Sequence, residues 1–229
     1  MDGPIAVAAG LIATGFMIDL ALGYKRRPRP HTAAYAVGIA MFAAATWALA
    51  FGLTLGWNGA AYRAFFLFGA ILNIPYLALG SMYLVIGRRA GTIMFIAVGA
   101  ISAISITLTT TVDFTAPLPT GGIPHDIFPP ISDGFGPRLL AAIAGGSGAT
   151  IIILLSIVSV FRFWRRNRRL VVGNLLITAG AFAAAWGGTG LAIGAGAAFA
   201  LSLLLAATLI WAGYRLATGA RRAVAPSPA

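Results

Sequence analysis

The sequence predicts an all-α integral membrane protein, a seven-transmembrane-helix bundle with its N-terminus outside and its C-terminus inside. Three observations support this fold class. Of 229 residues, 59% are hydrophobic and only 9% are charged, whereas about a quarter of a soluble domain is charged. Apolar stretches of membrane-spanning length recur along the chain. The basic residues gather in alternate connections between those stretches.

The predicted spans follow from the length of helix that crosses the hydrocarbon, about 20 residues. They cover residues 4–24, 32–55, 62–86, 92–111, 138–161, 170–188 and 190–214. Only Gly187-Gly188-Thr189-Gly190 separates the last two. A single kinked element is the alternative there, but 170–214 is too long for one crossing.

The orientation follows from lysine and arginine, which favour the cytoplasmic side of a membrane. On one side lie 14 of the 16 basic residues, from Lys25 to Arg29, at Arg88 and Arg89, from Arg162 to Arg169, and from Arg215 to Arg222. Arg63 and Arg138 fall on the other side. This asymmetry predicts a multi-pass protein of the plasma (inner) membrane.

The formal net charge of +11 has the same explanation. Short loops at helix ends hold the basic residues, so we expect contact with the lipid bilayer and its anionic lipids rather than nucleic acid. The first residues, MDGPIA, lack a positively charged start. We therefore expect no cleaved signal peptide.

Two pairs of similar stretches suggest an internal repeat. Gly3-Pro4 and Gly136-Pro137 each begin a predicted helix, and FAAATW at 42–47 is echoed by FAAAW at 182–186. Residues 3–86 and 136–214 could be parallel repeats joined by a linker helix, 92–111, and an outer proline-rich loop, 112–137. Chance similarity between alanine-rich helices is the alternative. Either way we expect one membrane domain over 1–215 and a cytoplasmic tail, 216–229.

This three-one-three layout resembles the SWEET and PQ-loop sugar transporters, which also have seven helices and an outer N-terminus. The resemblance covers the layout alone, because the chain has no glutamine and so lacks the family's proline-glutamine dipeptide. Seven helices also suggest microbial rhodopsins, which bind retinal through a lysine in the last helix. The single lysine here is Lys25, in the first connection, which excludes that class.

Polar residues within spans indicate function or tight structural pairing. Asp19 is the only acid within a predicted span, and Asn174 lies at a similar depth. With Ser81 and Tyr83 they could form a polar cluster that holds a proton, a cation or a substrate hydroxyl. Alternatively, Asp19 reaches the interface and pairs with Lys25 or Arg26.

The stretch LNIPYLALG, 72–80, is the most irregular part of any span. Pro75 cannot donate to the carbonyl of Ile71, and Asn73 places an amide near the membrane midplane. A broken helix with a polar midplane residue is typical of transporter sites, so we predict a binding site at Asn73 and Tyr76. Trp47 and Trp186 could line it. The alternatives are a packing kink and membership of the aromatic belt.

No cofactor, metal site or enzyme activity is expected. Gly145-Gly146-Ser147-Gly148 fits the GxSG of rhomboid proteases, but no histidine follows His125 to activate the serine. His125 and Asp126 lack the spacing of metal ligands, and His31 lies at a helix end rather than within the bundle.

Two functions remain open. The first is passage or binding of a neutral or weakly polar small solute within the bundle, which the scarcity of ionisable residues favours. The second is a non-transporting membrane subunit or ligand sensor that docks a partner through the outer loop 112–137. A homo-oligomer or a membrane-complex partner is compatible with both.

Overall fold

The computed structural model describes residues 2–163, 168–192 and 196–222 and is helical almost throughout. Its elements are α1 (Asp2–Arg26), α2 (Pro30–Leu55), α3 (Gly59–Ala64), the π-helix η1 (Phe65–Leu72), α4 (Asn73–Val85), α5 (Arg88–Thr111), the 3₁₀ turn η2 (Ile131–Asp133), α6 (Pro137–Phe163), α7 (Arg168–Ala192) and α8 (Gly196–Arg222). These described residues form no strand. The predicted all-helical fold is thus confirmed.

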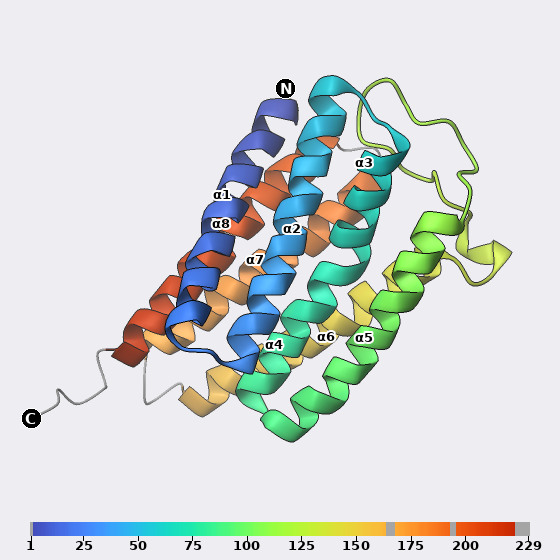
Figure 1. Ribbon diagram of the computed structural model, residues 1–229. Coiled ribbons are helices and arrows are strands. Elements are labelled where there is room, and N and C mark those ends of the chain that lie inside the picture. Colours follow the sequence, from blue (N-terminus) through green and yellow to red (C-terminus); the bar gives the residue numbers. More distant parts are fainter. Residues whose placement is uncertain (1, 164–167, 193–195, 223–229) are drawn as a thin grey trace, which may run out of the picture.

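α3, η1 and α4 follow one another without a break, so the described residues form seven long rods (Figure 1). Within the described residues, six of these rods are long and apolar enough to cross a membrane. The apolar part of the remaining rod, α7, is the shorter stretch Val171–Ala184. Several long apolar helices fit a membrane-spanning protein.

The boundary predicted between the last two helices is wrong. Gly187-Gly188-Thr189-Gly190 lies inside α7, which continues to Ala192. A Cβ at Gly187 would collide with the hydroxyl of Ser202 on α8. Glycine serves here for close helix–helix packing rather than for a turn.

α8 continues to Arg222, so its last turns belong to the stretch 216–229 that the sequence predicts as a cytoplasmic tail. Ala217, Ala220, Arg221 and Arg222 belong to the residue types with the highest helix propensity. This intrinsic preference carries the helix past the apolar segment.

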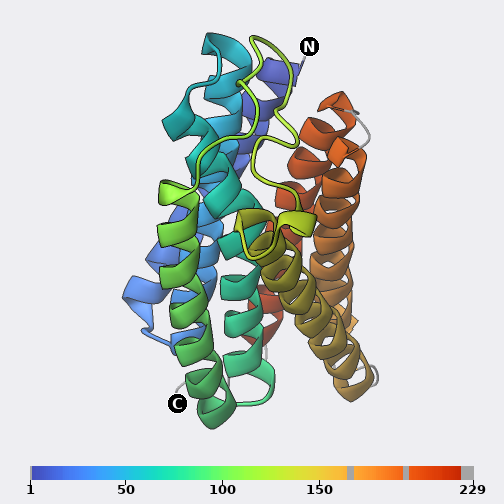
Figure 2. The ribbon, with the colours of Figure 1, turned by 90° about the vertical axis from the view of Figure 1, so that its right-hand side faces the viewer.

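The rods alternate in direction, which gives the bundle two chemically different ends (Figures 1 and 2). We call one the basic end: it holds the α1–α2 and α4–α5 connections, the end of α6 and the end of α8. The other is the loop end, with the N-terminus, the α2–α3 connection and residues 112–136. In Figure 2, α6 lies near α5 at the loop end and diverges from it toward the basic end.

Glycines bring α7 and α8 into close contact along their length. A Cβ at Gly180 would lie 2.9 Å from the carbonyl oxygen of Ala206, and one at Gly213 would meet the carbonyl of Gly173. Such small residues allow two backbones to approach within a membrane. α7 and α8 therefore form a tight antiparallel pair, beside which α6 stands at an angle.

The irregular segment of the third rod is the π-helix η1, immediately before the predicted break at 72–80. The N–H of Asn73 donates to the carbonyl of Phe68, five residues earlier. Pro75 explains the irregularity, since it cannot continue an α-helical hydrogen-bond ladder. A Cβ at Gly148 on α6 would lie 3.2 Å from the Pro75 nitrogen. The GxSG-like motif is thus a packing surface against this segment.

Candidate functional site

A cavity of about 1040 Å³ enters the bundle from the basic end. Residues of α1, α2, α4, α6, α7 and α8 line it, together with Arg27 and Arg29 of the α1–α2 connection. Its volume is that of a pocket for a drug-sized ligand.

The direction of each helix orders the lining residues by depth. Nearest the basic end is the rim: Arg26, Arg27, Arg29, His31, Arg162 and Arg215. Next comes a polar middle tier: Asp19, Tyr35, Ser81, Ser156, Ser159, Asn174 and Tyr214. Deepest is an apolar floor: Phe16, Ile39, Leu77, Ile152, Ile177, Ala181 and Ile210. Apolar residues, among them Leu22, Leu84 and Val85, also line the outer part of the cavity, but all its arginines lie at the mouth and the floor holds no charged side chain.

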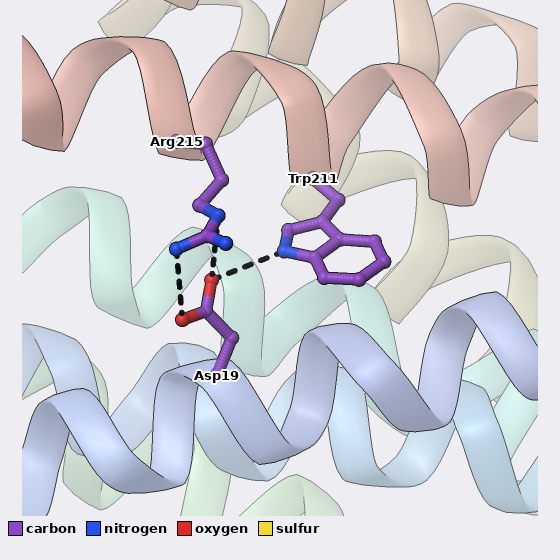
Figure 3. A network of polar contacts seen from close by, with 3 residues as sticks. All are labelled: Asp19, Trp211 and Arg215. Atoms are coloured by element: carbon purple, nitrogen blue, oxygen red, sulfur yellow. Dashed lines mark hydrogen bonds and ion pairs between the residues drawn. The ribbon is translucent and has the colours of Figure 1, made fainter.

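Asp19 joins α1 to α8 within the middle tier (Figure 3). The indole Nε1 of Trp211 donates to its Oδ2 over 3.1 Å, and the Nε of Arg215 lies 3.4 Å from the same oxygen. Trp211 and Arg215 are one turn apart on α8, so both reach one carboxylate. The ring of Trp211 also stacks on Phe16, with 6.1 Å between centroids.

The structure pairs Asp19 with Arg215 rather than with Lys25 or Arg26, the partners that the sequence offered as the alternative. Those residues follow on the same helix, whereas Arg215 lies almost two hundred positions away. The side chain of Arg215 is 66% exposed and that of Asp19 is 26% exposed. The ion pair is thus partly screened by solvent and contributes about 1 kcal/mol or less.

Two further polar pairs bridge helices in the middle tier. The hydroxyls of Tyr35 on α2 and Ser81 on α4 are 3.0 Å apart. The amide Nδ2 of Asn174 on α7 donates to the Ser159 hydroxyl on α6 over 2.6 Å. One bond joins α2 to α4 and the other joins α6 to α7, so each fastens two neighbouring helices of the cavity wall.

The structure brings together three of the four members of the predicted polar cluster. Asp19, Ser81 and Asn174 all line the cavity. Tyr83 does not, because its side chain packs with Ala34, Leu79 and Val98. Tyr83 also covers Gly91 on α5, where a Cβ would collide with its ring.

The predicted midplane pair separates onto two faces of α4. Asn73 is 6% exposed and precedes Leu77 and Ser81 by one and two turns, just beyond the apolar floor. Its Oδ1 is buried without a hydrogen-bond partner, although buried amide oxygens are normally satisfied. Tyr76 faces α5 instead and receives a hydrogen bond of 3.4 Å from Ser102.

Neither predicted tryptophan lines the cavity. Trp47 lies against α1, where its indole donates to the Thr14 hydroxyl over 3.0 Å and covers Gly10. Trp186 on α7 is 81% exposed. The aromatic belt, the alternative that the sequence left open for both tryptophans, stays a prediction.

The loop end is closed by an aromatic cluster. Its rings are Trp57, Tyr62, Phe65, Phe66, Phe114, Phe128 and Phe199, packed mostly edge to face. Phe128, Ile123 and Ile127 of the loop are buried in it. Residues 112–136 thus fold down onto the helices instead of extending from them.

Arg63 fastens the loop to the bundle. Its Nη1 donates to the carbonyls of Thr109 and Val112, the latter over 3.1 Å. Its guanidinium lies 4.4 Å from the ring centroid of Phe114, within the range of a cation–π contact. At the surface of the loop, Arg138 pairs with Asp126 over 2.7 Å.

Sequence reasoning missed the arginines and His31 as parts of a site, because it assigned them to topology. It also missed Tyr35 and Trp211. A periodic signal was available for Trp211, which stands one turn before an arginine near a helix end. Within the described ranges, no group of three or more potential metal ligands occurs.

Comparison with protein-family models, with curated proteins and with solved structures finds no match to this chain. The site must therefore be interpreted from its own chemistry.

Proposed function

We propose that this chain is a plasma-membrane protein that spans the bilayer seven times and binds a small molecule in the cavity for passage across the membrane. In this proposal the N-terminus is outside and the basic end is cytoplasmic, as the distribution of arginine favours. A three-one-three arrangement of repeats belongs to the same proposal. The observation that carries it is the cavity itself.

One end of the bundle is open and the other is packed, as we expect for a transporter held in one conformation. A cavity penetrates from the basic end as far as Phe16, Ile39 and Leu77. At the opposite end, tightly packed aromatic rings lie between the helices, and a smaller pocket of about 550 Å³ is lined by Asp2 and by residues of the loop rather than by the helix interior. Such an arrangement admits a solute from the basic end and blocks its access from the loop end.

The segment between the two ends has the features of a moving part. It contains the π-helix η1 and Pro75, both recognised causes of helix distortion. It also contains the buried, unpartnered oxygen of Asn73. A ligand or water molecule that moved deeper than Leu77 could donate a hydrogen bond to this oxygen.

Cysteine accessibility tests this proposal directly, because the chain contains no cysteine. The variants are Ser81→Cys in the cavity wall and Ser105→Cys, a position that is fully buried. Each is treated with a membrane-impermeant thiol reagent in intact cells and in inverted vesicles. We expect labelling of position 81 in inverted vesicles alone, and none of position 105.

Asn73→Cys locates the deep limit of the water-filled path. We expect labelling from the same side as position 81, but more slowly, because Asn73 lies beyond the floor. Absence of labelling at position 81 from both sides, in a folded protein, would contradict the proposal. Labelling from outside alone would contradict its orientation.

A further inference from the structure

We infer that the occupant of the cavity is an anionic amphiphile from the cytoplasmic leaflet, with a phosphate or carboxylate head at the rim and a hydrocarbon chain on the floor. This inference rests on the proposed function and names the class of its ligand. It departs from the neutral solute that the sequence favoured. Three observations carry it.

The first observation is an imbalance of charge. Five arginines line the cavity, and Asp19 is the only acid of the described residues that does so. Asp19 is already engaged by Arg215 and Trp211. The mouth of the cavity therefore has an excess of four positive charges, which favours an anion; guanidinium groups bind phosphate and carboxylate in bidentate geometry.

The second observation is the gradient of polarity. Below the arginines the hydroxyl and amide groups of Tyr35, Ser81 and Asn174 line the walls. Deeper still, Ile39, Leu77 and Ile152 present only hydrocarbon. A bare phosphate would leave this floor uncovered, whereas an alkyl chain would cover it and exclude water from it.

The third observation is the direction of the gradient. Charged groups lie at the end of the bundle and apolar groups lie toward its middle, as the head and chain of a lipid lie in the adjacent leaflet. A lipid could enter without inverting. Basic pockets between membrane helices on the cytoplasmic side are known to hold anionic headgroups.

The test uses the full chain in neutral detergent and an alkyl phosphate with a photoreactive diazirine at the end of its chain. The matched probe is the same alkyl chain with a zwitterionic phosphocholine head. Inorganic phosphate is added as a competitor. After illumination, mass spectrometry of peptides locates the attachment.

We expect the alkyl phosphate to attach to floor residues of α2, α4 or α6 and to be displaced by unlabelled alkyl phosphate but not by inorganic phosphate. The double variant Arg29→Gln/Arg162→Gln should reduce the affinity of the probe by about tenfold or more. Arg88→Gln/Arg89→Gln is the matched control, since these arginines are at the same end but outside the cavity lining. It should change affinity by less than about twofold.

Several results would overturn the inference. Equal attachment of the phosphocholine probe would show that the arginines do not select charge. Displacement by inorganic phosphate would identify a free anion as the ligand. Attachment spread over the lipid-facing side of α5, or equal losses in the two double variants, would show non-specific partitioning. If labelling of Ser81→Cys persists in these cases, the proposed function stands and only the ligand class fails.

Discussion

The two ends of the bundle are built from the same helices but are packed in opposite ways. At the loop end, rings from three helices and the loop fill the space between the rods. At the basic end the helices separate around a cavity of about 1040 Å³. The difference shows that the side chains at the helix ends, rather than the helices themselves, decide where the bundle is hollow.

Solvation explains the difference. An arginine cannot be removed from water without a cost of several kcal/mol unless it is paired, so helices whose ends are rich in arginine cannot close on one another. Arg63 is an instructive exception at the loop end. It is accommodated because the carbonyls of Thr109 and Val112 and the ring of Phe114 replace its water.

The largest effect is expected from opening the closed end. Phe128→Ala removes a fully buried ring from the aromatic cluster, and should lower the free energy of unfolding by about 3–5 kcal/mol. Phe135→Ala is the control within the same loop, since Phe135 is 62% exposed. We expect that control to change stability by less than about 0.5 kcal/mol. Unfolding titration in mixed micelles measures both.

Limited proteolysis adds a local readout to that comparison. Phe128→Ala should make residues 112–136 susceptible to cleavage, while Phe135→Ala should not. Equal protection of the loop in both variants would mean that the ring of Phe128 does not hold the loop end closed.

An intermediate effect is expected where α6 crosses the boundary between the two ends. Gly148→Ala would place a Cβ 2.9 Å from Cγ2 of Ile74 and 3.2 Å from the Pro75 nitrogen. The overpacking should cost about 1–2 kcal/mol. Gly146→Ala is the matched control two residues earlier, with no atom within 4 Å of its Cβ. It should leave stability unchanged or raise it by up to about 1 kcal/mol, so the midpoint of thermal unfolding should fall for Gly148→Ala and should not fall for Gly146→Ala.

The smallest effect is expected at the hollow end. Asp19→Asn removes the ion pair with Arg215 but retains an oxygen for the Trp211 indole, so the loss should be about 1 kcal/mol or less. It should also shrink as salt is added, because the pair is partly exposed. Asp133→Asn, at an exposed turn, serves as the control for a lost surface charge. A loss as large as that of Phe128→Ala would mean that this end is packed after all.

The sequence allowed the fold to be predicted because hydrophobic length is a local property. The predicted spans 32–55, 92–111 and 138–161 fall within α2, α5 and α6, with ends only a few residues apart. The error at Gly187–Gly190 has a specific cause. Glycine both ends helices and allows close packing, and only the position of Ser202 on a neighbouring helix distinguishes these roles.

The candidate site could be predicted only in part. Depth along each helix was enough to bring Asp19, Ser81 and Asn174 to one level, because depth follows from counting residues. Rotation about the helix axis was not accessible, so Tyr83 was included and Tyr35 omitted. The pairing of Asp19 with Arg215 depends on α1 lying beside α8, which no local pattern indicates.

The π-helix η1 fixes the rotational phase between the two halves of the third rod. One residue inserted into an α-helix turns everything beyond it by about 100° about the axis. With η1 present, Tyr62 and Phe65 face the aromatic cluster while Leu77 and Ser81 face the cavity. If the third rod were a regular α-helix throughout, one of these two faces would rotate away from the side chains that it contacts. Closure at the loop end and the lining of the cavity are therefore not independent: a single change of helical register would alter both.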